Sequence, residues 1–162
     1  MFIRRVVIVL VLISLSSIAL AKYNDEFNRF MPGREPTGFR GIQWGTPIFN
    51  LESENFKLLK SDGDEKIYIK EDENYMLDVA KVDKIEYYFW QDAFYKVNIY
   101  AKGASKKSRL AIYVLRQFGR ARKIEGCYRY KGSSTGVMFC NQPGEDLTVL
   151  TIYSLFHFYR ED

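Results

Sequence analysis

The two cysteines of the chain flank a short turn at equal distances, which predicts a β-hairpin of defined register. The turn signal is Gly132-Ser-Ser-Thr135, and Cys127 and Cys140 lie on either side of it. A two-residue turn at its centre makes Cys127 face Cys140 at a non-hydrogen-bonded position, where Cα atoms are about 4.5 Å apart. A disulfide spans that distance. We therefore predict a structural disulfide; the alternative, a catalytic thiol pair, is typical of Cys-x-x-Cys spacing, which is absent.

The first 21 residues have the pattern of a secretory signal peptide. Arg4 and Arg5 precede the apolar stretch Val6–Leu15, and Ala19-Leu-Ala21 is a small-x-small cleavage site. A membrane anchor is the alternative, but a spanning helix requires about 20 apolar residues. We expect cleavage, no transmembrane segment in the mature chain, and a periplasmic or secreted location, where disulfides are stable.

The rest of the chain divides into a leader and one domain. Residues 22–38 mix prolines, glycines and charges without a period, so we expect a flexible leader before a domain over residues 39–162. Runs rich in Tyr, Phe, Val and Ile around turn signals predict β-hairpins. These strands are expected at residues 56–60 with 66–70, 84–90 with 94–101, and 127–131 with 136–140. A last strand, 147–159, is apolar on both faces and is expected near the centre of a sheet.

Two helices are expected. Leu110, Val114 and Phe118 form an apolar stripe that predicts a helix between Ser105 and Gly119, and Thr46-Pro47 predicts the start of a short one. The predicted fold class is α+β: one domain with an antiparallel sheet of about six or seven strands and one long and one short helix packed on one face. A closed barrel is the alternative. Helix-then-strands occurs twice, which suggests a structural duplication.

One stretch supports a family resemblance. Phe39-Arg-Gly-Ile-Gln-Trp-Gly-Thr46 resembles the opening of uncharacterised small exported bacterial α+β proteins, and Tyr87-Tyr-Phe-Trp90 and Phe118-Gly119 match later parts of their pattern. The resemblance implies export and the α+β fold, and no catalytic residues. The order of elements is also similar to small envelope-assembly lipoproteins and β-lactamase inhibitor proteins, an analogy of architecture only. Within this stretch we expect Trp44 to be a core residue.

The composition excludes several chemistries. The only histidine, His157, lies near the end of the last strand, where a structural role is favoured over a general base. Zinc requires three or four ligands, which one histidine and a bridged cysteine pair do not supply. The acidic residues at 62–65 and 71–73 lack the EF-hand pattern, so we expect no metal site and no cofactor. A hydrolase that uses carboxylates alone remains an alternative.

Charge is distributed unevenly along the chain. Residues 22–101 carry 11 basic and 15 acidic residues, whereas residues 102–162 carry 11 basic and 5 acidic ones. Basic residues in and after the long helix form a candidate anion-binding surface; the alternative is an ordinary solvated helix face. These candidates are Lys106, Lys107, Arg109, Arg116 and Arg120.

Export, a disulfide-closed hairpin and a 16% share of aromatic residues together favour a protein that works by binding. We expect a non-enzymatic binding or interaction module of the cell envelope, whose partner is an unidentified envelope protein or an anionic envelope component. The alternative is a small-ligand-binding protein with a cavity between helix and sheet. Nucleic acid is not an expected partner of an exported chain.

Overall fold

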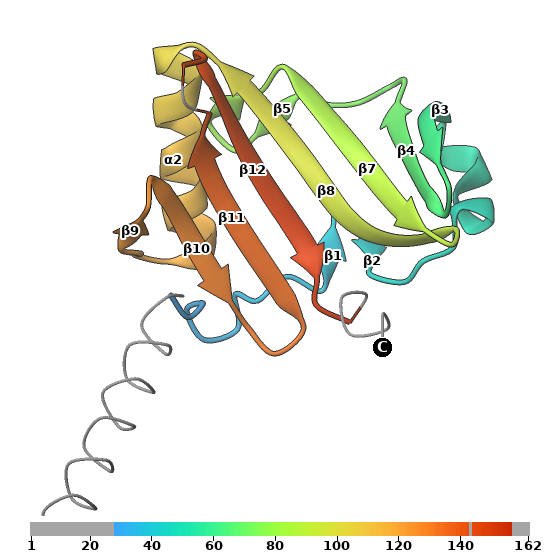
Figure 1. Cartoon of the computed structure of the whole chain (residues 1–162), viewed down its shortest axis with the longest axis horizontal. Coiled ribbons are helices and arrows are strands. Elements are labelled where there is room, and N and C mark those ends of the chain that lie inside the picture. The colour runs from blue at the N-terminus through green and yellow to red at the C-terminus, as the bar shows by residue number, and fades with distance from the viewer. Residues whose placement is uncertain (1–27, 143, 157–162) are drawn as a thin grey trace, which may run out of the picture.

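The structure is a computed structural model that describes residues 28–142 and 144–156 (Figure 1). It contains one α-helix, α2 (Ala104–Phe118), one 3-10 helix, η1 (Ile48–Glu54), and twelve strands within these residues. The strands are β1 (Gly38–Phe39), β2 (Ile42–Gln43), β3 (Phe56–Asp62), β4 (Glu65–Lys70), β5 (Met76–Leu77), β6 (Ala80–Lys81), β7 (Lys84–Trp90), β8 (Ala93–Lys102), β9 (Lys123–Ile124), β10 (Cys127–Lys131), β11 (Thr135–Asn141) and β12 (Leu147–Ser154).

Eight strands form one antiparallel sheet in the order β3-β4-β7-β8-β12-β11-β10-β9. The first four strands of this sheet form one meander and the last four form another. The last strands of the two meanders, β8 and β12, pair with each other from Leu147↔Lys102 to Tyr153↔Lys96. The two four-stranded halves of the sheet therefore meet at the pairing of β8 with β12, and both strands are central.

The predicted α+β fold class is wrong, because the described chain is mainly β. The large sheet has eight strands rather than six or seven, β1–β2 and β5–β6 add two small sheets, and α2 is the one α-helix of the described residues. The expected short helix is the 3-10 helix η1, kinked at Leu51, because the spacing of Ile48 and Leu51 suits three residues per turn. Strands of two residues are too short to show an alternating pattern. The barrel alternative is also wrong, since β3 and β9 are separate edges.

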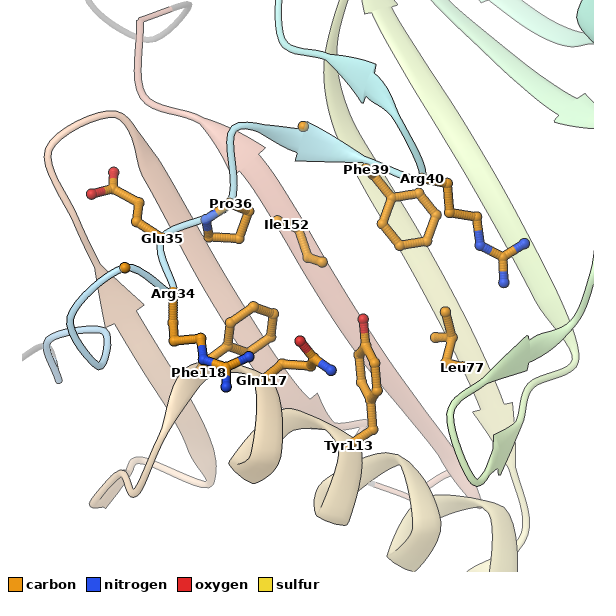
Figure 2. Close-up of a pocket in the computed structure, with 12 residues that line it drawn as sticks. Arg34, Glu35, Pro36, Phe39, Arg40, Leu77, Tyr113, Gln117, Phe118 and Ile152 are labelled. Carbon is orange, nitrogen blue, oxygen red and sulfur yellow. The ribbon is translucent and has the colours of Figure 1, made fainter.

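The helix α2 covers one face of the large sheet, and β1–β2 and β5–β6 lie on the same side (Figures 1 and 2). Leu110, Val114 and Phe118 are at most 4% exposed, so the predicted apolar stripe is the face that packs on the sheet. The helix begins after Gly103 rather than at Ser105, and it ends at Gly119 as expected. Burial of this stripe, at about 1.5–3 kcal/mol per side chain, joins helix and sheet into one core.

The hairpin of β10 and β11 has the predicted register. Cys127 pairs with Cys140 and forms a disulfide, with the Cα atoms 4.4 Å apart. The N–H of Gly132 donates to the carbonyl of Thr135 (2.9 Å), which closes the two-residue turn. The predicted disulfide is therefore confirmed.

The stretch that carries the family resemblance opens with a tight β-ribbon. Arg40 and Gly41 form its two-residue turn, with φ angles of 51° and 82°. A turn with positive φ at both positions places Phe39 opposite Ile42, and both side chains are buried. The glycine in this stretch is thus required by the backbone of the turn.

Trp44 is a packing residue, as expected. Its ring lies against Phe94, with centroids 5.0 Å apart, and packs on the core. Its indole N–H donates to the Oγ1 atom of Thr135 (2.9 Å). The side chain thereby ties the β2 end of the ribbon to the large sheet.

The face of the large sheet opposite α2 carries a polar network. Tyr88 and Tyr100 both donate to Oε2 of Glu86, at 2.8 and 2.7 Å, and Lys84 pairs with Oε1. The amide of Asn98 donates to both tyrosine hydroxyls. Burial raises the pKa of Glu86, but the hydrogen bonds from Lys84 and the tyrosines outweigh this and lower it. The network satisfies its own polar groups.

Candidate functional site

A solvent-open cavity of about 330 Å³ lies between α2, the segment before β1, and the covered face of the large sheet (Figure 2). This volume is at the lower end of the range that small-molecule sites occupy. We refer to it as the α2 cavity.

The inner wall of the α2 cavity is apolar. Phe39 from β1, Leu77 from β5, Phe118 from α2 and Ile152 from β12 line it, and each is at most 6% exposed. Four elements far apart in the sequence therefore converge on one apolar surface. Such a surface holds the apolar part of a ligand by the hydrophobic effect.

The outer wall carries three polar side chains that point into the cavity in Figure 2, Arg34, Tyr113 and Gln117. Their guanidinium, hydroxyl and amide groups form no hydrogen bond or ion pair within the described residues. Burial raises the pKa of Tyr113, an effect that the nearby Arg40 charge reduces, so the hydroxyl is a neutral donor at pH 7. These three groups are available to a ligand.

Arg40 lines the same cavity, but its charge is already balanced. Its guanidinium forms an ion pair with Glu73 and donates to the carbonyl of Met76 (2.8 Å). The Glu73 side chain is only 2% exposed and also accepts a hydrogen bond from the hydroxyl of Tyr87. This cluster closes one end of the cavity and leaves no free charge there.

Glu35 also lines the cavity, but its carboxylate points away, toward the β10–β11 turn (Figure 2). Oε1 accepts from the N–H groups of Ser134 (2.6 Å) and Thr135 (2.9 Å), and the hydroxyls of Ser134 and Ser133 donate to the same carboxylate. Burial raises the pKa of Glu35, but the hydrogen bonds from Ser134 and Ser133 outweigh burial and lower it to about 2. Glu35 therefore anchors the cavity wall to the sheet.

The replacement Glu35→Gln is expected to lower the free energy of unfolding at pH 7 by about 1–2 kcal/mol, because a charged acceptor is lost and solvent screens part of the effect. The folded pKa of about 2 lies below the ordinary value of 4.5. The carboxylate thus stabilises the fold above pH 4.5, and this contribution is lost between pH 4.5 and about 2. Urea unfolding at several pH values measures it. Equal pH profiles for the native protein and the variant would contradict the anchor, and Glu52→Gln, an exposed glutamate, is the control.

The segment that forms the outer wall was placed in a flexible leader by its sequence. In the structure, residues 28–38 lie along the domain. The Asn28 amide donates to the carbonyl of Arg122 (3.0 Å) and accepts from its N–H (2.9 Å). The ring of Phe30 packs edge-on against Phe118, with centroids 5.8 Å apart. Composition did not reveal this segment as part of the site, because its partners are about a hundred residues away.

Two residues of the candidate anion-binding surface are engaged by carboxylates. Lys106 pairs with Asp83, and Arg116 pairs with Asp78 at 3.0 Å. The acidic first half of the chain thus neutralises part of the basic helix.

The other three candidates are dispersed. Lys107 lines a second, smaller cavity of about 150 Å³ beside Lys123, whereas Arg109 and Arg120 are exposed. The structure therefore does not gather the five candidates into one site. The α2 cavity instead involves Tyr113 and Gln117, which the sequence did not single out; their position one turn apart beside the apolar stripe was the available signal.

Several other predictions from the sequence concern residues or features outside the α2 cavity. His157 and the signal peptide lie outside the described residues. In the part of the chain that the structure describes, no group of three or more His, Cys, Asp or Glu side chains is placed to hold a metal ion. Likewise, no helix there has the length and apolar character needed to span a membrane.

Glu35, which lines the α2 cavity, and Glu73, the partner of the lining Arg40, both accept hydrogen bonds from the protein. Both carboxylates are therefore already engaged by groups of the protein itself.

Comparisons with known proteins add no relative. No family model matches the chain, and no curated protein or solved structure matches it significantly. The family resemblance of the Phe39–Thr46 stretch therefore stays a prediction.

Proposed function

We propose that this protein is an exported, non-enzymatic binding protein that takes up a small molecule in the α2 cavity. The observation that carries the proposal is the composition of its walls: an apolar inner wall faces three side chains whose polar groups form no hydrogen bond or ion pair within the described residues. Apolar pockets with a few convergent polar groups are typical ligand sites. The signal-peptide pattern and the disulfide support export.

A macromolecular partner, the other expectation from the sequence, has less support. On the face of the large sheet opposite α2, Tyr88 and Tyr100 hydrogen-bond to Glu86. Groups that are already satisfied contribute little to binding a partner, because any new contact replaces an existing one.

The proposal is tested by filling the α2 cavity. Ligand-observed NMR with a set of small apolar and amphipathic compounds is expected to detect binders with a Kd of about 0.1–1 mM, the affinity typical of a dozen or so well-placed atoms. In Gln117→Trp the new ring occupies the cavity, so we expect these signals to disappear.

The matched control is Ile112→Trp, which adds the same ring on an exposed part of α2 away from the cavity. Compounds should bind this variant as they bind the native protein. Binding that survives in Gln117→Trp, or the absence of any binder to the native protein, would contradict the proposed function.

A further inference from the structure

We infer that the ligand of the α2 cavity is a small apolar molecule that carries one carboxylate group, bound by the guanidinium of Arg34. This inference rests on the proposed function and names the class of ligand. It follows from the charges around the cavity and from the geometry of the groups that are free to bind.

The charges that line the cavity leave one cation unbalanced. Arg40 is paired with Glu73, and Glu35 is turned toward the β10–β11 turn, where N–H and hydroxyl groups hold its charge. Arg34 is the one lining charge without a counter-charge or hydrogen-bond partner among the described residues. A ligand with a single negative charge therefore completes the balance.

The neighbouring groups favour a planar anion with one apolar end. The guanidinium presents parallel N–H groups that match the two oxygens of a carboxylate. Gln117 and Tyr113 lie one turn apart on α2 and point into the same cavity, where each offers a further donor (Figure 2). The rest of the ligand then meets the apolar inner wall of the cavity. A phosphate monoester carries about two negative charges at pH 7, and one of them would stay uncompensated here.

The experiment compares acids with their neutral counterparts. A panel of alkanoic and arylalkanoic acids, with phenylbutanoate as one member, is titrated into the full mature protein beside the matching primary amides and phenyl phosphate. Binding is followed by two-dimensional NMR, which also reports whether the shifts lie at the α2 cavity. We expect the best acids to bind at least about tenfold more tightly than their amides, the difference that one charge-assisted hydrogen bond contributes.

Variants assign the preference to one residue. Arg34→Gln should weaken the acids more than the amides and so remove the advantage of the acids. Arg34→Lys should restore part of this advantage, because the charge returns without the planar geometry. Arg29→Gln is the matched control, since Arg29 is an exposed arginine of the same segment that does not line the cavity.

Three results would overturn the inference. In the first, acids and amides bind the native protein and Arg34→Gln equally well, and neither binds Gln117→Trp. This result would support the proposed function but show that the ligand needs no carboxylate. In the second, phenyl phosphate binds more tightly than the acids, which would show that the site prefers a phosphate group to a carboxylate. In the third, no member of the panel binds, which would contradict the inferred ligand class. The apolar and amphipathic compounds used to test the proposed function would then show whether the cavity binds any small molecule.

Discussion

Replacing Glu73 by alanine is expected to lower the free energy of unfolding by about 3 kcal/mol. The carboxylate is 2% exposed and holds both the Arg40 guanidinium and the hydroxyl of Tyr87, which itself is 1% exposed. Removing it leaves a partly buried cation and a buried hydroxyl without their acceptor, and both groups have already lost their water. Urea unfolding followed by tryptophan fluorescence measures the loss.

An exposed ion pair on the same side of the molecule provides the control. Arg116 and Asp78 are 60% and 43% exposed, so Asp78→Asn should cost no more than about 1 kcal/mol. Asparagine also tolerates the positive φ of 53° at this position. A Glu73→Ala variant that is as stable as Asp78→Asn would show that the buried cluster contributes nothing beyond a surface pair.

Removing the disulfide is expected to have an effect of similar size. The replacements Cys127→Ala and Cys140→Ala together should lower the free energy of unfolding by about 3 kcal/mol, because the bridge closes a loop with a sequence separation of 13 and restricts the unfolded chain. The β10–β11 turn also holds Glu35, so a loosened hairpin should weaken the wall of the α2 cavity as well.

Reduction of the native protein gives an independent measurement. Adding a thiol reductant should lower the urea midpoint of the native protein to that of the double variant, and it should not change the midpoint of the double variant. If the double variant unfolds at the native midpoint, the bridge does not stabilise the fold, and the chain-entropy account is wrong for this hairpin.

Local signals made the hairpins predictable. The register of the Cys127–Cys140 hairpin follows from counting outward from its turn, and the apolar stripe of α2 follows from residues three and four apart. The fold class was wrong because the spacing of Ile48 and Leu51 suits a 3-10 turn as well as an α-helix, and because two-residue strands leave no pattern in the sequence.

The candidate site was less predictable, because its parts meet only after folding. Glu35 accepts hydrogen bonds from Ser134 and Thr135, which are about a hundred residues away in the chain. The sequence around Glu35 contains no signal that predicts these contacts. The prolines and glycines around Glu35 are typical of a flexible segment. Long-range hydrogen bonds hold the segment around Glu35 in place, and amino-acid composition cannot predict such bonds.

The arrangement of the large sheet has a consequence for how the chain reaches its native state. In the described part, the sheet has seven strand pairings. Six of them join strands of this sheet that are consecutive along the chain, and only the pairing of β8 with β12 joins the two meanders. Neighbouring pairings close short loops and form early, whereas the central pairing must wait for a longer loop to close. Each meander is thus a folding unit with mostly local contacts. We therefore expect the pairing of β8 with β12 to be the slowest step of folding.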